Sequence, residues 1–553
     1  MPRTPIKRPK PSRWNALLGW ELLRVSRRTG ALAIGRFVLG ASLLGIMWLL
    51  YSAEFARYDR LEGNATEIAK RLSEFAGAFA LTFFFVQLTI VLLLTPIFVA
   101  GSVFEERDTR SGEVLLTTDL TRREIFYGKY LARVVQVMMI VAAGLPILAL
   151  TFLWGGVSMI FIVVSYVVTF LCIFSSGAIA VSVAGGSETF REAILKAYGY
   201  ILVFHGLIVP ASPYMVIGTA QFENFGTVCT GILFLPAQLL ITFISLGYGL
   251  RWLRLAMLRQ RKRITAELAE KMANRHPPVA QESPLVWKEK YVSAQTKTVQ
   301  AAILGVSIGV AVLMGLIVVL SIQEPGGWLL SFIVPLALLG AAVTVGVGAA
   351  SGVATERQKN TLIDLFMIPG GRAEILRAKF VGALWRGRWP VALVGLLLPM
   401  AFVNGSPLVA LPLVALAAVA YLVFGAALGV WLSVRCKSAL SATAAWVGTV
   451  GLGLIGTFLV ADASATWNYD TKERERPEWG PVVNPALALY ELSMHPDRGP
   501  GYSTYGLHPF LVVPDKPPRL LAPLAGVTLY AAAGGLLWLL ALRRFEREGR
   551  EDG

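Results

Sequence analysis

Long runs of apolar residues constrain this chain more than any other feature of its sequence. Twelve windows contain about 20 mainly apolar residues each, the length that an α-helix needs to cross a bilayer. They lie near 37–53, 77–103, 134–154, 158–184, 198–219, 228–250, 298–321, 328–350, 389–403, 407–434, 439–461 and 521–542. The runs are continuous and lack the alternation of apolar and polar residues seen in membrane strands. They therefore predict an all-α polytopic membrane protein with about 12 transmembrane helices.

Composition supports the same conclusion. The 553 residues are 55% hydrophobic and only 16% charged, whereas soluble domains carry about 25% charged residues. The net charge of +16 does not predict a nucleic-acid partner, because the basic residues lie beside the ends of apolar runs and form no basic-aromatic module. We expect them to set membrane topology and to contact the anionic headgroups of the lipid bilayer.

The distribution of Lys and Arg predicts the orientation. These residues are dense in 1–30, in 251–275 and in the tail after 542, and they are absent from the short connections at 154–157, 220–227, 322–327 and 404–406. Cytoplasmic flanks collect positive charge, so both termini are predicted to be cytoplasmic in the plasma (inner) membrane of a prokaryote. Residues 1–13 are basic and rich in proline and are predicted to form a disordered tail.

One polar segment occurs twice. "ERDTRSGEVLLTTDLTRREIFYGK" begins at Glu106 and "ERQKNTLIDLFMIPGGRAEILRAK" begins at Glu356, and the two align without a gap at an offset of 250 (356 − 106). The matched pairs are Glu106 with Glu356, Arg107 with Arg357, Ser111 with Thr361, Leu115 with Leu365, Arg122 with Arg372, Glu124 with Glu374, Ile125 with Ile375, and Lys129 with Lys379. Upstream of each copy, "WNALLGWELLR" at 14–24 and "SPLVWKEKY" at 283–291 both place a Trp and a Glu before the first apolar run of a half.

This repeat predicts a chain built from two parallel six-helix units. The first unit covers 14–262, the cytoplasmic linker 263–283 and the second unit 284–553, with an extracytoplasmic loop at 462–520. Because each copy has an even number of spans, both keep the same orientation, and a pathway between the halves is expected.

The repeated segment contains a helix-start signal. Thr121 followed three positions later by Glu124 is a capping box, and in the second copy Pro369, Gly370 and Gly371 break the chain before Arg372. One interpretation is an ordinary cytoplasmic loop whose basic residues satisfy the topology rule. The other is a short helix that presents an apolar edge to a soluble partner. The duplicated spacing favours the second, since topology requires charge but not matched Ser/Thr, Leu, Glu and Lys.

Both copies resemble the cytoplasmic signature of ABC-2-type transporter permeases, in which Glu-Arg is followed by Thr-Leu, a Leu pair, a turn, Glu-Ile and Gly-Lys. The resemblance implies an interfacial helix before each half and a coupling helix that docks on an ATP-binding subunit. The coupling residues it implies are Glu106, Arg107, Leu115, Leu116, Thr121, Glu124, Lys129, Glu356, Arg357, Thr361, Leu365, Phe366, Glu374 and Lys379. The interfacial residues it implies are Trp14, Trp20, Glu21, Trp287 and Glu289. Asp119, Ser111-Gly112 and Gly370-Gly371 depart from the family pattern.

The chain contains no G-x-x-x-x-G-K-[ST] stretch that could bind ATP phosphates. We therefore expect a permease subunit and not an enzyme, with no cofactor or metal of its own, and with ATP and Mg²⁺ on two copies of a separate ATP-binding subunit. Two alternatives stay open: a secondary transporter driven by an ion gradient, and a non-transporting membrane scaffold that recruits an ATPase.

Overall fold

The computed structural model describes the chain in segments. These are 16–27, 29–55, 65–108, 120–155, 157–187, 189–208, 225–258, 283–292, 328–367, 371–388, 391–392, 410–463, 466–468, 473–475, 480–485, 487–489 and 521–551. The predicted tail at 1–13 and the predicted linker, up to residue 282, lie outside them, as does most of the loop at 462–520.

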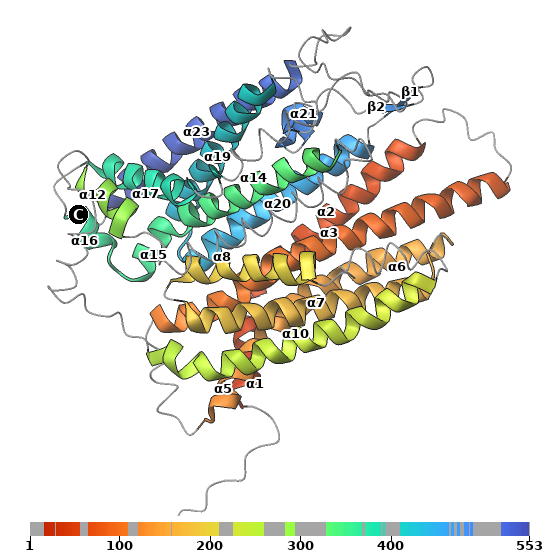
Figure 1. The fold of residues 1–553 in the computed structure, drawn as a ribbon, viewed down its shortest axis with the longest axis horizontal. Helices are drawn as coiled ribbons and strands as arrows, with labels where there is room; N and C mark the ends of the chain where they lie inside the picture. The colour runs from red at the N-terminus through yellow and green to blue at the C-terminus, as the bar shows by residue number, and fades with distance from the viewer. Residues whose placement is uncertain are drawn as a thin grey trace, which may run out of the picture. The chain divides into compact units, whose positions relative to one another are not determined.

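Helices dominate the described residues (Figure 1). In the first half they are α1 (Ala16–Arg27), α2 (Thr29–Phe55), α3 (Ala65–Asp108), α5 (Arg122–Val141), η1 (Ala142–Gly144), α6 (Leu145–Leu153), α7 (Met159–Gly186), α8 (Phe190–Ile201), η2 (Leu202–Ile208) and α10 (Phe225–Leu258). In the second half they are α12 (Pro284–Trp287), η4 (Lys288–Val292), α14 (Trp328–Ala350), α15 (Gly352–Gln358), α16 (Leu362–Phe366), α17 (Arg372–Arg386), α19 (Ala410–Arg435), α20 (Ala439–Ala463), α21 (Gly480–Val483) and α23 (Leu521–Glu551). Two three-residue strands, β1 (Thr466–Asn468) and β2 (Glu473–Glu475), pair antiparallel inside the loop predicted at 462–520.

Six helical segments of the described chain are long and apolar enough to cross a membrane. They are Ile68–Phe104, Arg123–Leu153, Met159–Gly186, Phe234–Arg251, Pro412–Arg435 and Leu521–Glu548. Gly35–Trp48 and Ala439–Leu454 are shorter apolar helices. A helical, membrane-type fold is therefore confirmed at this level. The predicted runs at 298–321 and, for the most part, 389–403 fall outside the described residues, so the number 12 stays a prediction.

The chain forms two compact units that differ from the predicted halves. Unit 1 comprises Met1–Leu44, Ala76–Ser187 and Val209–Gln260, and unit 2 comprises Gly45–Phe75, Glu188–Ile208 and Arg261–Gly553. Two segments of the first half, 45–75 and 188–208, thus belong to unit 2. The second of them contains α8, which packs against α14 of the second half.

Unit 1 is held by α7, which packs along α10 and against α5, while α1 packs on α5 (Figure 1). Gly249 of α10 lies where α10 meets α5 and α7. A methyl group there would come within 2.9 Å of the Phe126 ring on α5 and 3.2 Å of the Ser182 backbone on α7. The small residue therefore permits close helix packing, as in other membrane helix interfaces.

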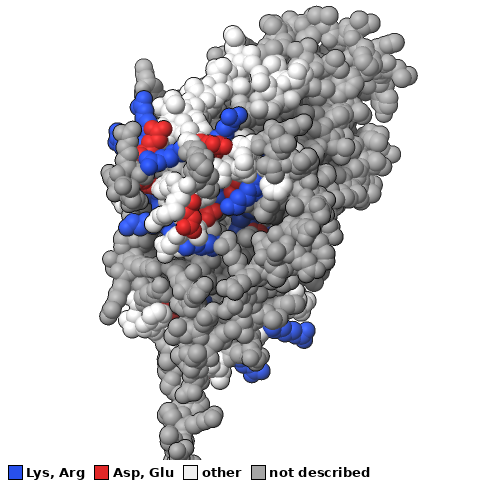
Figure 2. All heavy atoms as spheres, turned by 90° about the vertical axis from the view of Figure 1, so that its left-hand side faces the viewer, with Lys and Arg blue, Asp and Glu red and all other residues white. Residues whose placement is uncertain are grey.

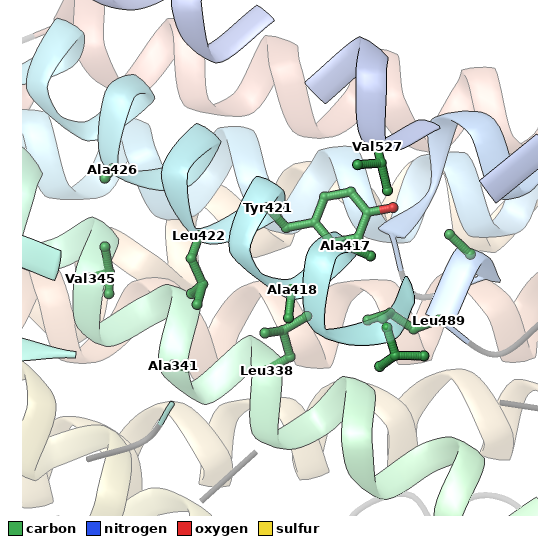
Figure 3. Close-up of a cluster of buried hydrophobic side chains, with 12 residues drawn as sticks. Leu338, Ala341, Val345, Ala417, Ala418, Tyr421, Leu422, Ala426, Leu489 and Val527 are labelled. Carbon is green, nitrogen blue, oxygen red and sulfur yellow. The ribbon is translucent and has the colours of Figure 1, made fainter. Parts of the chain in front are cut away.

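In unit 2, α19 packs along α14 and along α23 (Figure 1). Leu338, Ala341 and Val345 of α14 are buried against Tyr421 and Leu422 of α19 (Figure 3). Small residues bring these helix backbones together, since a methyl group at Gly429 would lie 3.0 Å from the carbonyl oxygen of Gly346.

Trp446 of α20 closes the same interface. Its indole ring lies on Gly346 of α14, and its Nε1 donates a 2.8 Å hydrogen bond to the carbonyl oxygen of Gly425 on α19. Trp446 is fully buried, and this hydrogen bond satisfies its one polar atom.

Large apolar side chains also cover the outside of the long helices. On α10, Phe243 is 70% exposed and Ile244 is 63% exposed, and on α23 Leu536 is 59% exposed. Contiguous apolar exposure of this kind is unusual in water and is the expected surface of a helix that contacts lipid.

Charged side chains of unit 2 gather at one end of its helices. Figure 2 shows basic and acidic residues side by side on the face formed by α12, α16 and α17. The predicted coupling residues of the second copy lie at this end of unit 2.

Candidate functional site

The second copy of the repeated segment folds as three short helical pieces. α15 ends at Gln358, a turn follows, α16 begins at Leu362 and α17 begins at Arg372. Asn360 in the turn has φ of 56°, a left-handed conformation that Asn tolerates better than most residues. The chain therefore reverses direction sharply between α15 and α16.

The apolar side chains of α16 point in two directions. Leu362 and Leu365 are buried in a cluster with Ile375 and Phe545, and the Phe366 ring lies 5.3 Å from the ring of Phe545 on α23. The two predicted coupling residues Leu365 and Phe366 thus face the protein interior.

The opposite side of α16 is exposed. Ile363 is 59% and Met367 is 76% exposed, and Lys359 and Asp364 beside them are also exposed. Among the described residues, the exposed apolar edge at α16 therefore consists of Ile363 and Met367, which sequence reasoning did not single out.

Lys379 joins three segments in one ion cluster. Its Nζ lies 2.6 Å from Oε1 of Glu289 in η4 and 3.0 Å from Oε1 of Glu356 in α15. The Thr361 hydroxyl donates to the other oxygen of Glu356. Four residues singled out in the sequence, of which Glu289 comes from a distant segment, therefore meet at one place.

Glu289 is the centre of this cluster. Its second oxygen accepts a 3.2 Å hydrogen bond from Arg386, two helical turns after Lys379 on the same face of α17. Burial by itself would raise the pKa of Glu289, but the positive charges of Lys379, Arg386 and Arg191 outweigh burial and lower it to about 2. Glu289 is therefore a carboxylate throughout the physiological pH range.

Glycine at position 382 makes this approach possible. A methyl group there would lie 2.7 Å from Cβ of Glu289, closer than side-chain atoms can come. The glycine lets η4 lie directly on α17, so the carboxylate reaches both cations.

Arg191 reaches the same cluster from α8 and was not predicted. Burial lowers the pKa of Arg191 to about 9, repulsion from Arg386 acts in the same direction, and attraction to Glu289 and Glu192 opposes both. Burial also lowers the pKa of Arg386. No local sequence signal marks Arg191, whereas the seven-residue spacing from Lys379 to Arg386 could have identified Arg386.

The remaining predicted residues of the second copy also have partners. Arg357 donates to the carbonyl oxygens of Val434 and Cys436, at 2.9 and 2.7 Å, and pairs with Glu548. Glu374 accepts from the Ser283 hydroxyl. These contacts tie the polar segment to the ends of α19 and α23.

In the first copy of the repeated segment, a helix begins at the position that matches the start of α17 in the second copy. Thr121 caps α5, which begins at Arg122: its hydroxyl accepts from the Glu124 amide, and the Glu124 carboxylate accepts from the Thr121 amide at 2.7 Å. The predicted capping box is confirmed. Glu106 and Arg107 lie in the last turn of α3, and their side chains are outside the described part of the structure. Leu115 and Leu116 lie wholly outside the described residues.

A buried Glu–Lys pair also occurs in the first copy. Lys129 Nζ lies 3.9 Å from Oε1 of Glu21, with side chains only 4% and 3% exposed. Lys129 and Lys379 are 250 residues apart (379 − 129), and each meets a glutamate from the segment that precedes the first apolar run of its half.

The segments that contain the two glutamates, α1 for Glu21 and α12 with η4 for Glu289, differ in how their Trp residues are exposed. In α1, Trp20 is 55% and Leu23 60% exposed, while Glu21 is buried, so the apolar side faces outward as at a membrane surface. Trp287 is partly buried. Trp14 lies outside the described residues.

Helix boundaries follow the same offset. α3 ends at Asp108 and α15 at Gln358, and α5 and α17 begin at Arg122 and Arg372, each pair 250 apart (358 − 108 = 372 − 122). Packing partners correspond as well: α5 contacts α1 and α7, and α17 contacts η4 and α19.

Within the described segments, no three His, Cys, Asp or Glu side chains converge as they would around a metal ion. Comparison with family models and with curated protein sequences finds no match for this chain.

Proposed function

We propose that this chain is the membrane-spanning permease subunit of an ATP-driven exporter of ABC-2 type, with two half-transporters in tandem and ATP hydrolysis on separate subunits. The observation that carries the proposal is the pair of buried Glu–Lys contacts, Glu21 with Lys129 and Glu289 with Lys379. The two lysines stand at the same register of the duplicated polar segment, and each glutamate comes from the segment upstream of its copy. A loop that served topology alone would need positive charge, but not a buried acid from a second segment in each copy.

The second copy suggests how a partner would act. Ile363 and Met367 form an exposed apolar edge flanked by charge, which fits a groove with an apolar floor on a soluble subunit. Behind them, Leu365 and Phe366 fix α16 to α17 and α23. A force applied to α16 would thus reach the membrane helices through packed contacts instead of a loose loop.

The energies are of the right order. Reversing a two-state equilibrium from 1:99 to 99:1 takes about 5.5 kcal/mol. Burial of Ile or Met side chains contributes roughly 1.5–3 kcal/mol each. The exposed edge formed by Ile363 and Met367 would thus supply binding energy comparable to that requirement.

The arrangement of the chain as two repeated halves is part of the proposal. We propose twelve spans in two parallel six-helix repeats, with both termini and both polar segments in the cytoplasm of a prokaryote. The matched helix boundaries and packing partners of the two copies support it. So does the grouping of charged side chains at the α12, α16 and α17 end of unit 2 (Figure 2).

The test is affinity purification of the tagged chain from its native membrane in mild detergent, with mass spectrometry of co-purifying proteins. The proposal expects a soluble protein with a phosphate-binding loop, released by the double variant Ile363→Ser, Met367→Ser and retained by the control Arg377→Ser. Repeated purification of the folded chain without such a protein would count against it.

Transport in reconstituted vesicles separates the alternatives. The proposal expects substrate movement that requires ATP and the co-purified subunit and persists when ion gradients are collapsed. A secondary transporter would lose transport with the gradient, and a scaffold would bind the ATPase without moving any solute.

A further inference from the structure

We propose that Arg191 is a positioning residue that ties the first half of the chain to the ion cluster of the second half, so that the two halves share one charged junction at Glu289. The inference concerns assembly of the membrane part, and its coupling consequence rests on the proposed function.

The path of the chain is the first observation. α8 belongs by sequence to the first half, yet it lies in unit 2 and packs against α14. Its counterpart by the 250-residue offset, α20, stays with its own half and packs against α14 and α19. α8 is therefore an arm that the first half contributes to the compact unit formed by the second.

Three glycines lie beside the charged side chains of the cluster. A methyl group at Gly348 of α14 would lie 3.8 Å from Cδ of Arg191, and one at Gly352 would lie 3.5 Å from Cδ of Lys379. At Gly382 a methyl group would lie only 2.7 Å from Cβ of Glu289, so glycine is required there. The methyl position at Gly348 is also 3.8 Å from Cβ of Ala383, the neighbour of Gly382, so Arg191 passes α14 beside the part of α17 on which Glu289 packs.

The charges around Glu289 show what Arg191 adds. Glu289 and Glu356 carry two negative charges, and Lys379 and Arg386 carry two positive charges. The cluster is thus already neutral without Arg191. Arg191 adds one further positive charge beside Glu289 and Arg386, and attraction to Glu289 favours its charged form.

A matched control lies one turn away on the same helix. Lys196 pairs with Glu192 across 2.6 Å within α8, so Lys196→Gln removes a positive charge from α8 without touching Glu289. Lys196→Gln breaks the ion pair of the buried Glu192 and lowers stability for that reason, so the comparison is the coupling to Glu289. The effect of Arg191→Gln must shrink in the Glu289→Gln background, and the effect of Lys196→Gln must not.

The experiment is a double-mutant cycle on the full-length chain in detergent, with thermal unfolding followed by fluorescence. Variants are Arg191→Gln, Lys196→Gln, Glu289→Gln, each of the first two combined with Glu289→Gln, and Arg191→Lys. We expect Arg191→Gln to shift the unfolding equilibrium about tenfold in the wild type but little in the Glu289→Gln background, because the attraction between the two charges is lost when either one is removed. Arg191→Lys should restore most of the loss.

A second measurement tests whether Arg191 helps to hold the two halves of the chain together. A protease site inserted into the linker between 263 and 282 allows the chain to be cut after folding, and the two pieces are then separated by size. The wild-type and Lys196→Gln pieces should stay together, and Arg191→Gln should release a larger fraction. Additive effects in the cycle, or equal retention by Arg191→Gln and Lys196→Gln, would overturn the inference. Neither measurement involves an ATPase, so failure of the proposed function leaves both results intact.

Discussion

Lys379 donates to the carboxylate of Glu289 across 2.6 Å, although 90 residues separate them in the sequence. Their side chains are each 9% exposed, so this is a buried ion pair between η4 and the middle of α17. The same contact recurs between Glu21 and Lys129, at a longer distance. A buried pair of this kind is costly to break because the remaining charge has no compensation.

Removing one member of the pair should destabilise unit 2. We expect Glu289→Gln to reduce the free energy of unfolding by about 3–5 kcal/mol, because it leaves Lys379 and Arg386 buried without their shared carboxylate. Thermal unfolding in detergent measures the change. The control is Lys70→Gln in the exposed pair with Glu74, where less than about 1 kcal/mol is expected. Equal effects of both variants would contradict the assignment.

Acid should weaken the same cluster. The pKa of Glu289 is lowered from 4.5 to about 2, so its stabilising contribution is complete above pH 4.5 and is lost as the pH falls toward 2. The difference corresponds to on the order of 3 kcal/mol. Unfolding midpoints measured from pH 7 to pH 3 should fall less steeply for Glu289→Gln than for the wild type. Parallel curves would show that Glu289 does not carry this dependence.

Gly346 should not tolerate a side chain. A methyl group at this position would lie 1.9 Å from Cζ2 of the buried Trp446 ring, so Gly346→Ala must displace Trp446 and its hydrogen bond to Gly425. We expect a loss of more than about 3 kcal/mol or failure to fold, measured by expression and thermal unfolding. Gly340 lies on the same helix with open space around it, and Gly340→Ala should behave like the wild type.

The two faces of α16 should separate stability from partner binding. Leu365→Ala creates a cavity beside Ile375 and Phe545 and should cost about 2–5 kcal/mol of folding stability. Ile363→Ser should leave the unfolding midpoint unchanged and, if the proposed ATP-binding subunit docks on this edge, weaken its association about tenfold or more. The measurements are thermal unfolding and co-purification yield. A folded Leu365→Ala variant with normal stability would show that the inner face does not hold α16.

The capping box should protect the start of α5. Thr121→Ala removes the hydroxyl that accepts from the Glu124 amide and should cost about 1 kcal/mol of local helix stability. Hydrogen exchange followed by mass spectrometry should show faster exchange in the first turn of α5. Arg123→Ala, an exposed change in the same turn, should leave exchange there nearly unaltered.

Local features were predictable from the sequence because they depend on near neighbours. The apolar runs place α3, α7, α19 and α23, since about 20 apolar residues are needed to span hydrocarbon. The capping box at Thr121 predicted the start of α5 to the residue. The repeat predicted that Glu356, Thr361 and Lys379 matter as a group, and they do meet in one cluster.

The direction of side chains could not be predicted in the same way. Leu365 and Phe366 were assigned to a partner because an amphipathic pattern shows that a helix has an apolar face, but not what covers that face. Phe545 of α23 covers it, from nearly 180 residues further along the chain. The edge left open, Ile363 and Met367, became visible only once that packing was known.

The sequence by itself thus determined where the helices lie, which segment is duplicated and which residues of it are polar, since these depend on periodicity and composition over short distances. Only the tertiary structure decided that Glu289 is buried among Lys379, Arg386 and Arg191, and that α8 of the first half belongs to unit 2. Charge clusters of this kind form where the packing of distant helices and small residues such as Gly382 bring side chains together. No local pattern encodes that arrangement.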